Sequence, residues 1–266
     1  MDKISLAENL KVVTVSENEK VGVFDIDGLY RGYGLTIGNA LRRVLLSSLP
    51  GAAITQMKIK GVLHEFSTIE GVMEDVVEIM LNLKNVRFQF PGDSGFTEPE
   101  TLTLKAKGEG EVTAADISES GRVSVVNKEQ KIATITKKGV ELEIELTIEK
   151  GFGYVPVETV KQGGSVAVGV IQIDALFSPV TKVTMTTENM RVGDQTDFNR
   201  ARLVIETDGG MSPSMALRQA LAILAEHFTK AFDQLGGAAA IESAPAVGES
   251  EAEVEKKPKK KSKKKE

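Results

Sequence analysis

Two apolar helical stripes, one near each end of the folded part of the chain, constrain the fold more than any other feature. The first helix is expected over residues 36–49, with Thr36 as its N-cap residue and Pro50-Gly51 as its end. The second begins at Ser212-Pro213 and ends at Gly236-Gly237. Stripes this long, separated by most of the chain, need each other for burial, with or without a symmetry-related copy. At helical spacing the stripes are Ile37, Leu41, Val44 and Leu45, and then Leu217, Leu221, Leu224, Phe228, Phe232 and Leu235.

The opposite face of the first helix is not purely polar. It carries Asn39, Arg42 and Arg43 together with Leu46, where a solvated helix would normally be polar throughout. One interpretation is a helix that packs on its own core with one side and contacts a partner with the other. A helix buried on both sides fits the same spacing equally well.

The composition argues against several classes of chemistry. Without cysteine the chain has neither disulfides nor a thiolate nucleophile, and its two histidines, His64 and His227, lie far apart in sequence. No run is apolar enough to cross a bilayer, and the segment MDKISLAENLKVV lacks the apolar core of a signal peptide. With 41% hydrophobic and 27% charged residues, we expect a globular protein of the cytoplasm.

Charge is distributed unevenly along the chain. Residues 256–266 hold eight lysines and one glutamate, whereas residues 242–255 hold five glutamates and no base. Since the whole chain carries −5, the remaining body carries −7. An acidic body is not typical of a domain that grips DNA by itself.

The middle of the chain, residues 86–178, predicts mainly strands. The clearest is Val140 to Ile148, where five apolar residues alternate with three glutamates and a threonine. This alternation predicts one buried face and one wet, acidic face. Upstream, Ser67-Thr68-Ile69-Glu70 has the spacing of a capping box and predicts a helix over residues 71–83.

The glycines before the first helix suggest a phosphate-binding loop, but their spacing fails. After Gly32 and Gly34, a dinucleotide fingerprint needs its third glycine at Ile37, and Gly38 comes one residue late. We therefore interpret these glycines as allowing a sharp turn and close packing.

A carboxylate cluster near the second helix is also unconvincing as a ligand site. Its members are spread without fixed ligand spacing, and the residues 197–200 among them are interpreted as a solvated loop. The sequence therefore predicts no catalytic residues, no cofactor and no metal site. The four carboxylates are Asp194, Asp197, Glu206 and Asp208.

Several collinear blocks of the chain resemble the N-terminal assembly domain of the bacterial RNA polymerase alpha subunit. The resemblance begins with the first helix and extends over residues 1 to about 235. Agreement of this extent is far more specific than any single motif. The blocks are RGYGLTIGNALRRVLLSSLPG from Arg31, GVLHEFSTIEGVMEDVVEIMLNLK from Gly61, GYVPVE from Gly153, FSPVTKV from Phe177, RVGDQTDFNRARLVIETDG from Arg191, and the helix after Ser212.

The resemblance implies an α+β fold in which strands and two long packed helices form a dimerisation domain with an inserted β-rich domain. It places the discontinuous dimerisation domain at residues 1–52 and 179–236, and the insert, which contacts large subunits, at residues 53–178. Residues 237–266, rich first in Ala and Glu and then in Lys, are expected to be disordered.

The resemblance also implies three sets of contact residues. The first and last helices would pack against their copies in a second subunit, the outer face of the first helix would hold the beta subunit, and a third set would contact the beta-prime subunit. The dimer set is Ile37, Leu41, Leu45, Leu217, Leu221, Leu224, Phe228 and Phe232; the beta set is Arg43 and Leu46; the beta-prime set is Lys84, Ile173, Val180 and Arg200.

The function implied is that of the alpha subunit of DNA-dependent RNA polymerase. Such a subunit is a non-catalytic part of a nucleotidyltransferase, and its homodimer nucleates assembly of the beta and beta-prime subunits for transcription. Two hypotheses from other classes are a stand-alone acidic adaptor with a nucleic-acid-binding lysine tail, and a nucleotide-dependent enzyme that uses the glycine-rich turn. Co-purification with two very large partners would distinguish the polymerase subunit from the adaptor and from the nucleotide-dependent enzyme.

The C-terminus departs from the family. The family normally continues through a linker into a second compact domain that binds DNA, whereas this sequence has a lysine tail there. DNA binding is therefore not carried over. The tail is expected either to attract DNA weakly and without sequence preference or to act only as a solubility tail.

Overall fold

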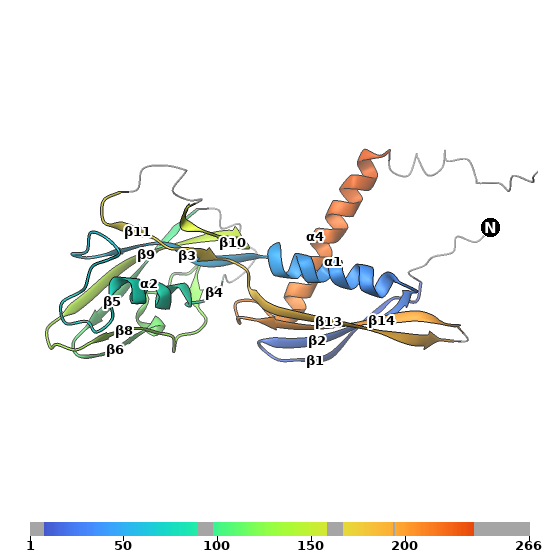
Figure 1. Ribbon diagram of the computed structural model, residues 1–266, viewed down its shortest axis with the longest axis horizontal. Coiled ribbons are helices and arrows are strands. Elements are labelled where there is room, and N and C mark those ends of the chain that lie inside the picture. The colour runs from blue at the N-terminus through green and yellow to red at the C-terminus, as the bar shows by residue number, and fades with distance from the viewer. Residues whose placement is uncertain (1–7, 90–97, 159–166, 194, 237–266) are drawn as a thin grey trace, which may run out of the picture. The chain divides into compact units, whose positions relative to one another are not determined.

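The computed structural model describes residues 8–89, 98–158, 167–193 and 195–236 (Figure 1). Helices and antiparallel sheets are segregated rather than alternating, so the predicted α+β class is confirmed. The chain divides into two compact units, residues 1–224 and 225–266, with the boundary inside helix α4 (Pro213–Gln234). The described part of the second unit is the C-terminal end of this helix and the turn after it.

Strands from both ends of the chain form one four-stranded antiparallel sheet in the order β1-β2-β14-β13. One face of the sheet packs against helix α1 and the first turns of α4. Phe24 and Leu203 of the sheet share a buried cluster with Leu41 and Leu45 of α1 and Leu217 of α4. The bounds are β1 (Lys11–Glu17), β2 (Val21–Tyr30), α1 (Tyr33–Ser47), β13 (Val180–Val192) and β14 (Gln195–Thr207).

A second antiparallel sheet, in the order β11-β3-β9-β5, has its own buried cluster. Helix α2 (Val76–Lys84) packs on it through Val76, Ile79 and Leu83. The sheet consists of β3 (Pro50–Ile59), β5 (Glu100–Lys107), β9 (Glu141–Phe152) and β11 (Val170–Gln172). Shorter elements are β4 (Phe88–Gln89), β6 (Gly110–Thr113), the 3₁₀ turn η1 (Ala114–Asp116), β7 (Ser124–Val125), β8 (Lys131–Ile135), β10 (Tyr154–Val155) and β12 (Ala175–Leu176).

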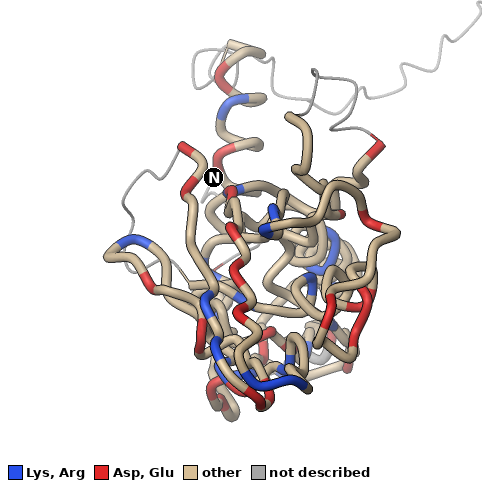
Figure 2. Tube along the Cα trace, turned by 90° about the vertical axis from the view of Figure 1, so that its left-hand side faces the viewer, with Lys and Arg blue, Asp and Glu red and all other residues tan. Residues whose placement is uncertain are grey.

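The alternating pattern of β9 is confirmed. Its apolar residues from Leu142 to Ile148 are buried, and its glutamates lie on the other face. That face is solvated, and lysines offset part of its negative charge, because Glu143 lies 3.1 Å from Lys60 and 2.7 Å from Lys105. Blue and red segments are likewise interspersed along the trace in Figure 2.

Helix α1 begins about one turn earlier than the sequence predicted, and the assignment of Thr36 as N-cap is wrong. The N-cap is Gly32, whose φ of 86° lies in the left-handed region that favours glycine. The close-packing interpretation of the glycines is confirmed, because a Cβ on Gly38 would lie 2.1 Å from the Sδ of Met185 in β13. The glycines therefore bring the helix down onto the sheet.

The capping box predicted at Ser67 does not form. Helix α2 begins later, after Asp75, whose carboxylate accepts a backbone N–H of the first turn at 2.7 Å. The residues between them approach strand β8 instead, since Val72 forms a β-bridge with Ile135. Tertiary pairing has overridden a local helix-start signal here.

The loop expected at residues 197–200 is also wrong, because these residues belong to strand β14. Its polar side chains pair with strand β2: Arg202 lies opposite Asp25, and Arg200 bonds to Asp27. The partners are more than 170 residues away in sequence, so a local pattern cannot reveal them.

Candidate functional site

The outer face of α1 is exposed, whereas its inner face is buried. Arg42 and Arg43 are exposed and Leu46 is 37% exposed, while Leu41 and Leu45 on the inner face are 0% exposed. The hydroxyl of Ser178 donates to the backbone carbonyl of Leu46 at 3.2 Å. Within the described chain, helix α1 therefore has a single buried face.

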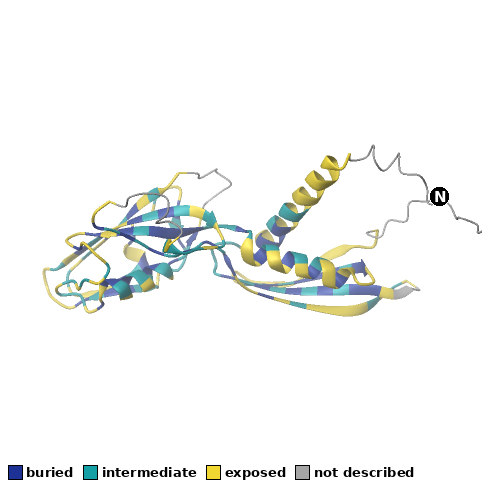
Figure 3. Ribbon diagram, turned by 45° about the horizontal axis from the view of Figure 1, so that its top comes forward, coloured by how far each residue is buried: buried dark blue, intermediate teal, exposed yellow. Residues whose placement is uncertain are grey.

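Helix α4 has a stripe that its own chain covers only at the start. Leu217 is 4% exposed and Leu224 is half-buried, whereas Leu221 is 38% exposed. Further along, Phe228 is 68% and Phe232 is 42% exposed. The exposed colouring towards the end of α4 is visible in Figure 3.

The eight residues of the expected dimer face are therefore in two different situations. Leu41, Leu45 and Leu217 are buried in the core of a single chain, and Ile37 is partly buried against the same cluster. Surface for a second copy is offered by Leu221, by the exposed part of Leu224, and by the two phenylalanines of α4.

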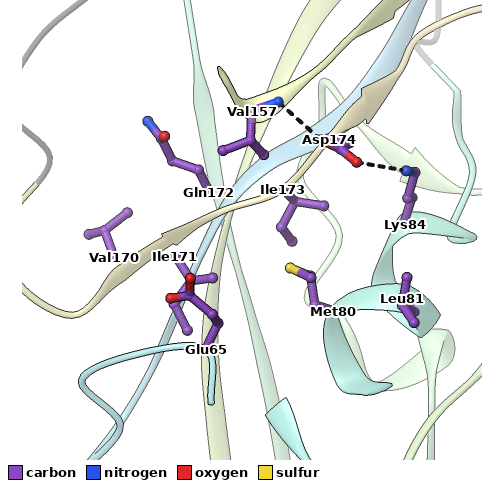
Figure 4. Close-up of a pocket in the computed structure, with 10 residues that line it drawn as sticks. All are labelled: Glu65, Met80, Leu81, Lys84, Val157, Val170, Ile171, Gln172, Ile173 and Asp174. Atoms are coloured by element: carbon purple, nitrogen blue, oxygen red, sulfur yellow. Dashed lines mark hydrogen bonds and ion pairs between the residues drawn. The ribbon is translucent and has the colours of Figure 1, made fainter. Parts of the chain in front are cut away.

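Two residues of the expected beta-prime set lie beside one cavity of about 350 Å³ in the insert (Figure 4). Lys84 Nζ lies 3.1 Å from Asp174 Oδ2 and 5.2 Å from the ring centre of Tyr154. Ile173 contributes to the wall although it is only 2% exposed. The backbone N–H of Val157 donates to Asp174 Oδ1 at 3.0 Å and, with Lys84, lowers the pKa of the Asp174 carboxyl.

The other two members of that set lie on the four-stranded sheet, apart from each other. Val180 pairs with Thr207 and Arg200 with Glu188, so roughly 23 Å of strand separates them at about 3.3 Å per residue. Val180 is 5% exposed. The structure therefore does not gather the four residues into one site.

Arg200 is held by partners within the chain. Its Nε and Nη2 donate to the two carboxylate oxygens of Asp27 at 2.6 and 3.1 Å. Beside it, Arg202 makes the same two-bonded contact with Asp25, at 2.8 Å for each bond. These hydrogen bonds lower the pKa of the Asp25 carboxyl, against the opposing effect of its burial.

The described carboxylates near the C-terminal end of β14 bind bases rather than each other. Glu206 lies 3.0 Å from Lys182, and Asp208 lies 3.6 Å from Arg87. Asp208 is not solvated, because its side chain is only 12% exposed, and this burial raises the pKa of its carboxyl. Asp194 lies outside the described residues. Within the parts of the chain that the structure describes, no group of side chains could hold a metal ion.

Exposed apolar residues in irregular segments were missed by sequence reasoning. Leu63 is 72%, Phe66 is 81% and Met73 is 67% exposed, all between β3 and α2. At the start of α1, Tyr33 and Leu35 are also exposed. Leu63, Phe66 and Met73 belong to no helical or strand period; their one sequence signal is large apolar residues within a segment that lacks any period.

None of the helices among the described residues is long and apolar enough to cross a membrane.

Comparisons with known proteins agree with one another. Residues 57–178 match the family model described as the RNA polymerase Rpb3/RpoA insert domain. The chain is 48% identical over 220 residues to the DNA-directed RNA polymerase subunit alpha of Carboxydothermus hydrogenoformans, covering 83% of this chain and 68% of the relative. The corresponding subunit of Alkaliphilus oremlandii is 47% identical and that of Aquifex aeolicus 46% identical, each over 218 residues, 82% of this chain and 67% of the relative.

Proposed function

The chain belongs to the family of DNA-directed RNA polymerase alpha subunits, and from that premise we propose that it is a homodimeric platform for polymerase assembly. In this role it supplies no active site. Residues 1–52 and 179–236 form the dimerising part, and residues 53–178 form an insert that contacts large subunits. The partners are a second copy of the chain and the beta and beta-prime subunits.

The observation that carries this proposal is the division of α1 into two faces. One face is buried on the chain's own sheet, and the other presents Arg43 beside the half-exposed Leu46. An arginine next to an apolar side chain is a common composition for an interface anchor, because arginine combines charge, several donors and apolar surface. We assign this face to the beta subunit.

The exposed stripe of α4 supports the dimer. A soluble chain does not normally expose two phenylalanines and a leucine at helical spacing on one helix, and a second copy would cover them. In an isologous dimer the same stripe would contribute from both chains. The buried residues Leu41, Leu45 and Leu217 would then act by holding the helices in place rather than by touching the partner.

Only two of the four residues expected to contact beta-prime remain candidates for direct contact. Lys84 and Ile173 share one cavity, whereas Val180 is buried and Arg200 is engaged by Asp27. We propose that beta-prime contacts the insert at Lys84 and Ile173, and that Val180 and Arg200 contribute through the shape of the sheet in each copy of the dimer.

The test is assembly by an Arg43→Ala chain. It is expected to remain dimeric by light scattering, because Arg43 lies off the buried stripe, yet to capture the beta subunit about tenfold less in co-purification. Arg122→Ala, at an exposed arginine of the insert, is the control and is expected to capture beta normally. Equal capture by all three chains would overturn the assignment of this helix face.

A further inference from the structure

The insert meets the turn that joins β14 to α4 through one nearly buried ion pair. Asp208 lies in this turn, and its Oδ2 lies 3.6 Å from Nε of Arg87, which belongs to the insert between α2 and β4. The side chain of Asp208 is 12% exposed and that of Arg87 is 17% exposed. The pair therefore links the insert to the point from which α4 begins.

On the insert side, Arg87 is held through its backbone. Its N–H donates to Asn127 Oδ1 at 2.7 Å, and its carbonyl accepts the N–H of Val126 at 2.9 Å. The side-chain amide of Asn127 also donates to the carbonyl of Asn85 at 2.9 Å. The segment that carries Arg87 therefore moves only with the insert.

On the other side, the turn is held by the four-stranded sheet. The N–H of Thr207 donates to the carbonyl of Lys20 at 2.7 Å, and that of Asp208 donates to the carbonyl of Pro179 at 3.0 Å. The N–H of Gly210 donates to Asp208 Oδ1 at 2.8 Å. Because each side has its own hydrogen bonds, the contact between the two sides is where they can separate.

The contact itself consists of close packing and the ion pair. A Cβ on Gly210 would lie 3.0 Å from the carbonyl oxygen of Phe88, so the turn approaches the backbone of the insert closely. The 3.6 Å between Arg87 and Asp208 is longer than a hydrogen bond between nitrogen and oxygen. The two charges are therefore taken out of water without a hydrogen bond between these two atoms.

This position is unfavourable for a charged carboxylate. Burial raises the pKa of the Asp208 carboxyl above its ordinary 3.8, although the hydrogen bond from Gly210 and the charges of Arg87 and Lys20 act in the opposite direction. A buried ion pair can lose more by desolvation than it gains by attraction. Because opening the contact would return Asp208 to water, the charged carboxylate favours the open arrangement and the protonated one the closed arrangement.

We propose that the contact between Arg87 and Asp208 is a clasp between the insert and the start of α4, loosened by the charge of Asp208 and tightened when that charge is lost. Opening lets the insert change its position relative to the four-stranded sheet, whatever partner the insert meets. The charged groups that face Asp208 are Arg87 from the insert and Lys20 from the turn between β1 and β2. Both keep their charge in mild acid, so Asp208 is the group that changes.

The distance between the insert and the sheet measures the state of the clasp. The chain has no cysteine, so Glu111→Cys in β6 and Thr184→Cys in β13, both at exposed positions, each take one spin label. Labelled chains are mixed with an excess of unlabelled chains, so that a dimer contains one labelled copy. Double electron–electron resonance then gives the distribution of distances within a single chain.

Asp208→Asn is the informative variant, because it removes the charge and keeps an oxygen for the N–H of Gly210. At neutral pH we expect a narrower distance distribution than in wild type. Acidification from neutral pH towards 3.8 should narrow the wild-type distribution and leave that of Asp208→Asn unchanged. The two histidines titrate alike in both chains, so the difference between the chains reports on Asp208.

Arg87→Met should act in the opposite direction. It keeps an apolar stem but leaves the Asp208 carboxylate without this partner, so the distribution should broaden at neutral pH. Adding Asp208→Asn to Arg87→Met should reverse most of the broadening, because the unpaired charge is then removed. Arg122→Met, at an exposed arginine of the insert, is the control and should match wild type at each pH.

Equal widths for wild type and Asp208→Asn at neutral pH would overturn the proposal. A wild-type distribution that broadens as the pH falls would also overturn it, because the charged pair would then be what holds the insert in place. Should Arg87→Met fail to fold, the comparison of wild type with the nearly isosteric Asp208→Asn across the same pH range decides alone.

Discussion

Helices α1 and α4 have similar stripes in the sequence but different surroundings in the fold. The stripe of α1 is used within the chain, where Leu41 and Leu45 have no exposed surface. The stripe of α4 is covered at Leu217, whereas further along Phe228 is 68% and Leu235 is 81% exposed. A periodic apolar stripe therefore predicts burial, but not whether the covering surface belongs to the same chain.

The outward faces of the two helices differ in the same instructive way. The outer face of α1 is mixed, with arginines around Leu46, whereas the exposed part of α4 carries an apolar stripe with Leu221, Phe228 and Phe232. A mixed face suits a partner that assembles onto an already stable dimer, and an apolar stripe suits a permanent contact between copies. The comparison supports the proposal that α4 forms the dimer contact and α1 the large-subunit contact.

The largest expected effect comes from removing a residue of the α1 stripe. Leu45→Ala leaves a cavity in the core and is expected to cost about 2–5 kcal/mol of unfolding free energy at every protein concentration. Leu221→Ala, on the exposed stripe, should lower stability mainly through the dimer, so its effect should depend on protein concentration. Denaturant melts at two concentrations measure both. If the loss of stability depended on protein concentration in Leu45→Ala but not in Leu221→Ala, the dimer contact would lie on α1 rather than on α4.

The sequence predicts most of the regular framework, and the misses have physical causes. The alternation in β9 and the Ser212-Pro213 start of α4 were correct because they depend on local pattern. The sequence wrongly predicts a loop at residues 197–200, because distant partners such as Asp27 for Arg200 are invisible to a local pattern. The sequence predicts the start of the helix after Ser67 too early, because the pairing of Val72 with Ile135 cannot be read from the local sequence.

The same reasoning applies to the candidate sites. Arg43 and Leu46 could be singled out because a leucine among arginines breaks the polar face. The cavity beside β11 could not, because its walls come from segments about 90 residues apart, joined only by the fold. The resemblance implies a contact role for Val180 but does not predict how exposed its side chain is. In the structure Val180 is buried in the core.

A smaller effect is expected from the ion pairs on the sheet face away from α1. Asp25→Asn should cost about 1–2 kcal/mol at neutral pH, since a charge-assisted contact is lost but Arg202 is itself partly exposed. Because the pKa of Asp25 is lowered from its ordinary 3.8, this stabilisation is complete above that value and is lost as the pH falls through the lower folded pKa.

Urea melts of wild type and Asp25→Asn between neutral and strongly acidic pH check this prediction. The difference in unfolding free energy should be constant above pH 3.8 and shrink below it. A difference that grows as the pH falls would mean that Asp25 is not stabilised as a carboxylate.

The smallest effect concerns the tail beyond α4, which lies outside the described residues. Ending the chain after Gly237 removes the lysine-rich segment and leaves both helices intact. If the tail attracts DNA, promoter binding by the assembled enzyme should weaken at low salt, less so at higher salt, and independently of upstream sequence. Equal binding at every salt concentration would leave the tail with a solubility role only.

The central claim is that a second copy covers the exposed stripe of α4, and molar mass measured by light scattering across a dilution series tests it directly. The wild-type chain should show twice its 28.6 kDa, and Leu221→Asp should show the single mass, because a buried carboxylate without a partner is costly. Leu63→Asp, at a 72% exposed loop position, is the control and should stay dimeric. A soluble Leu221→Asp chain that remains a dimer at the lowest concentration would contradict the account.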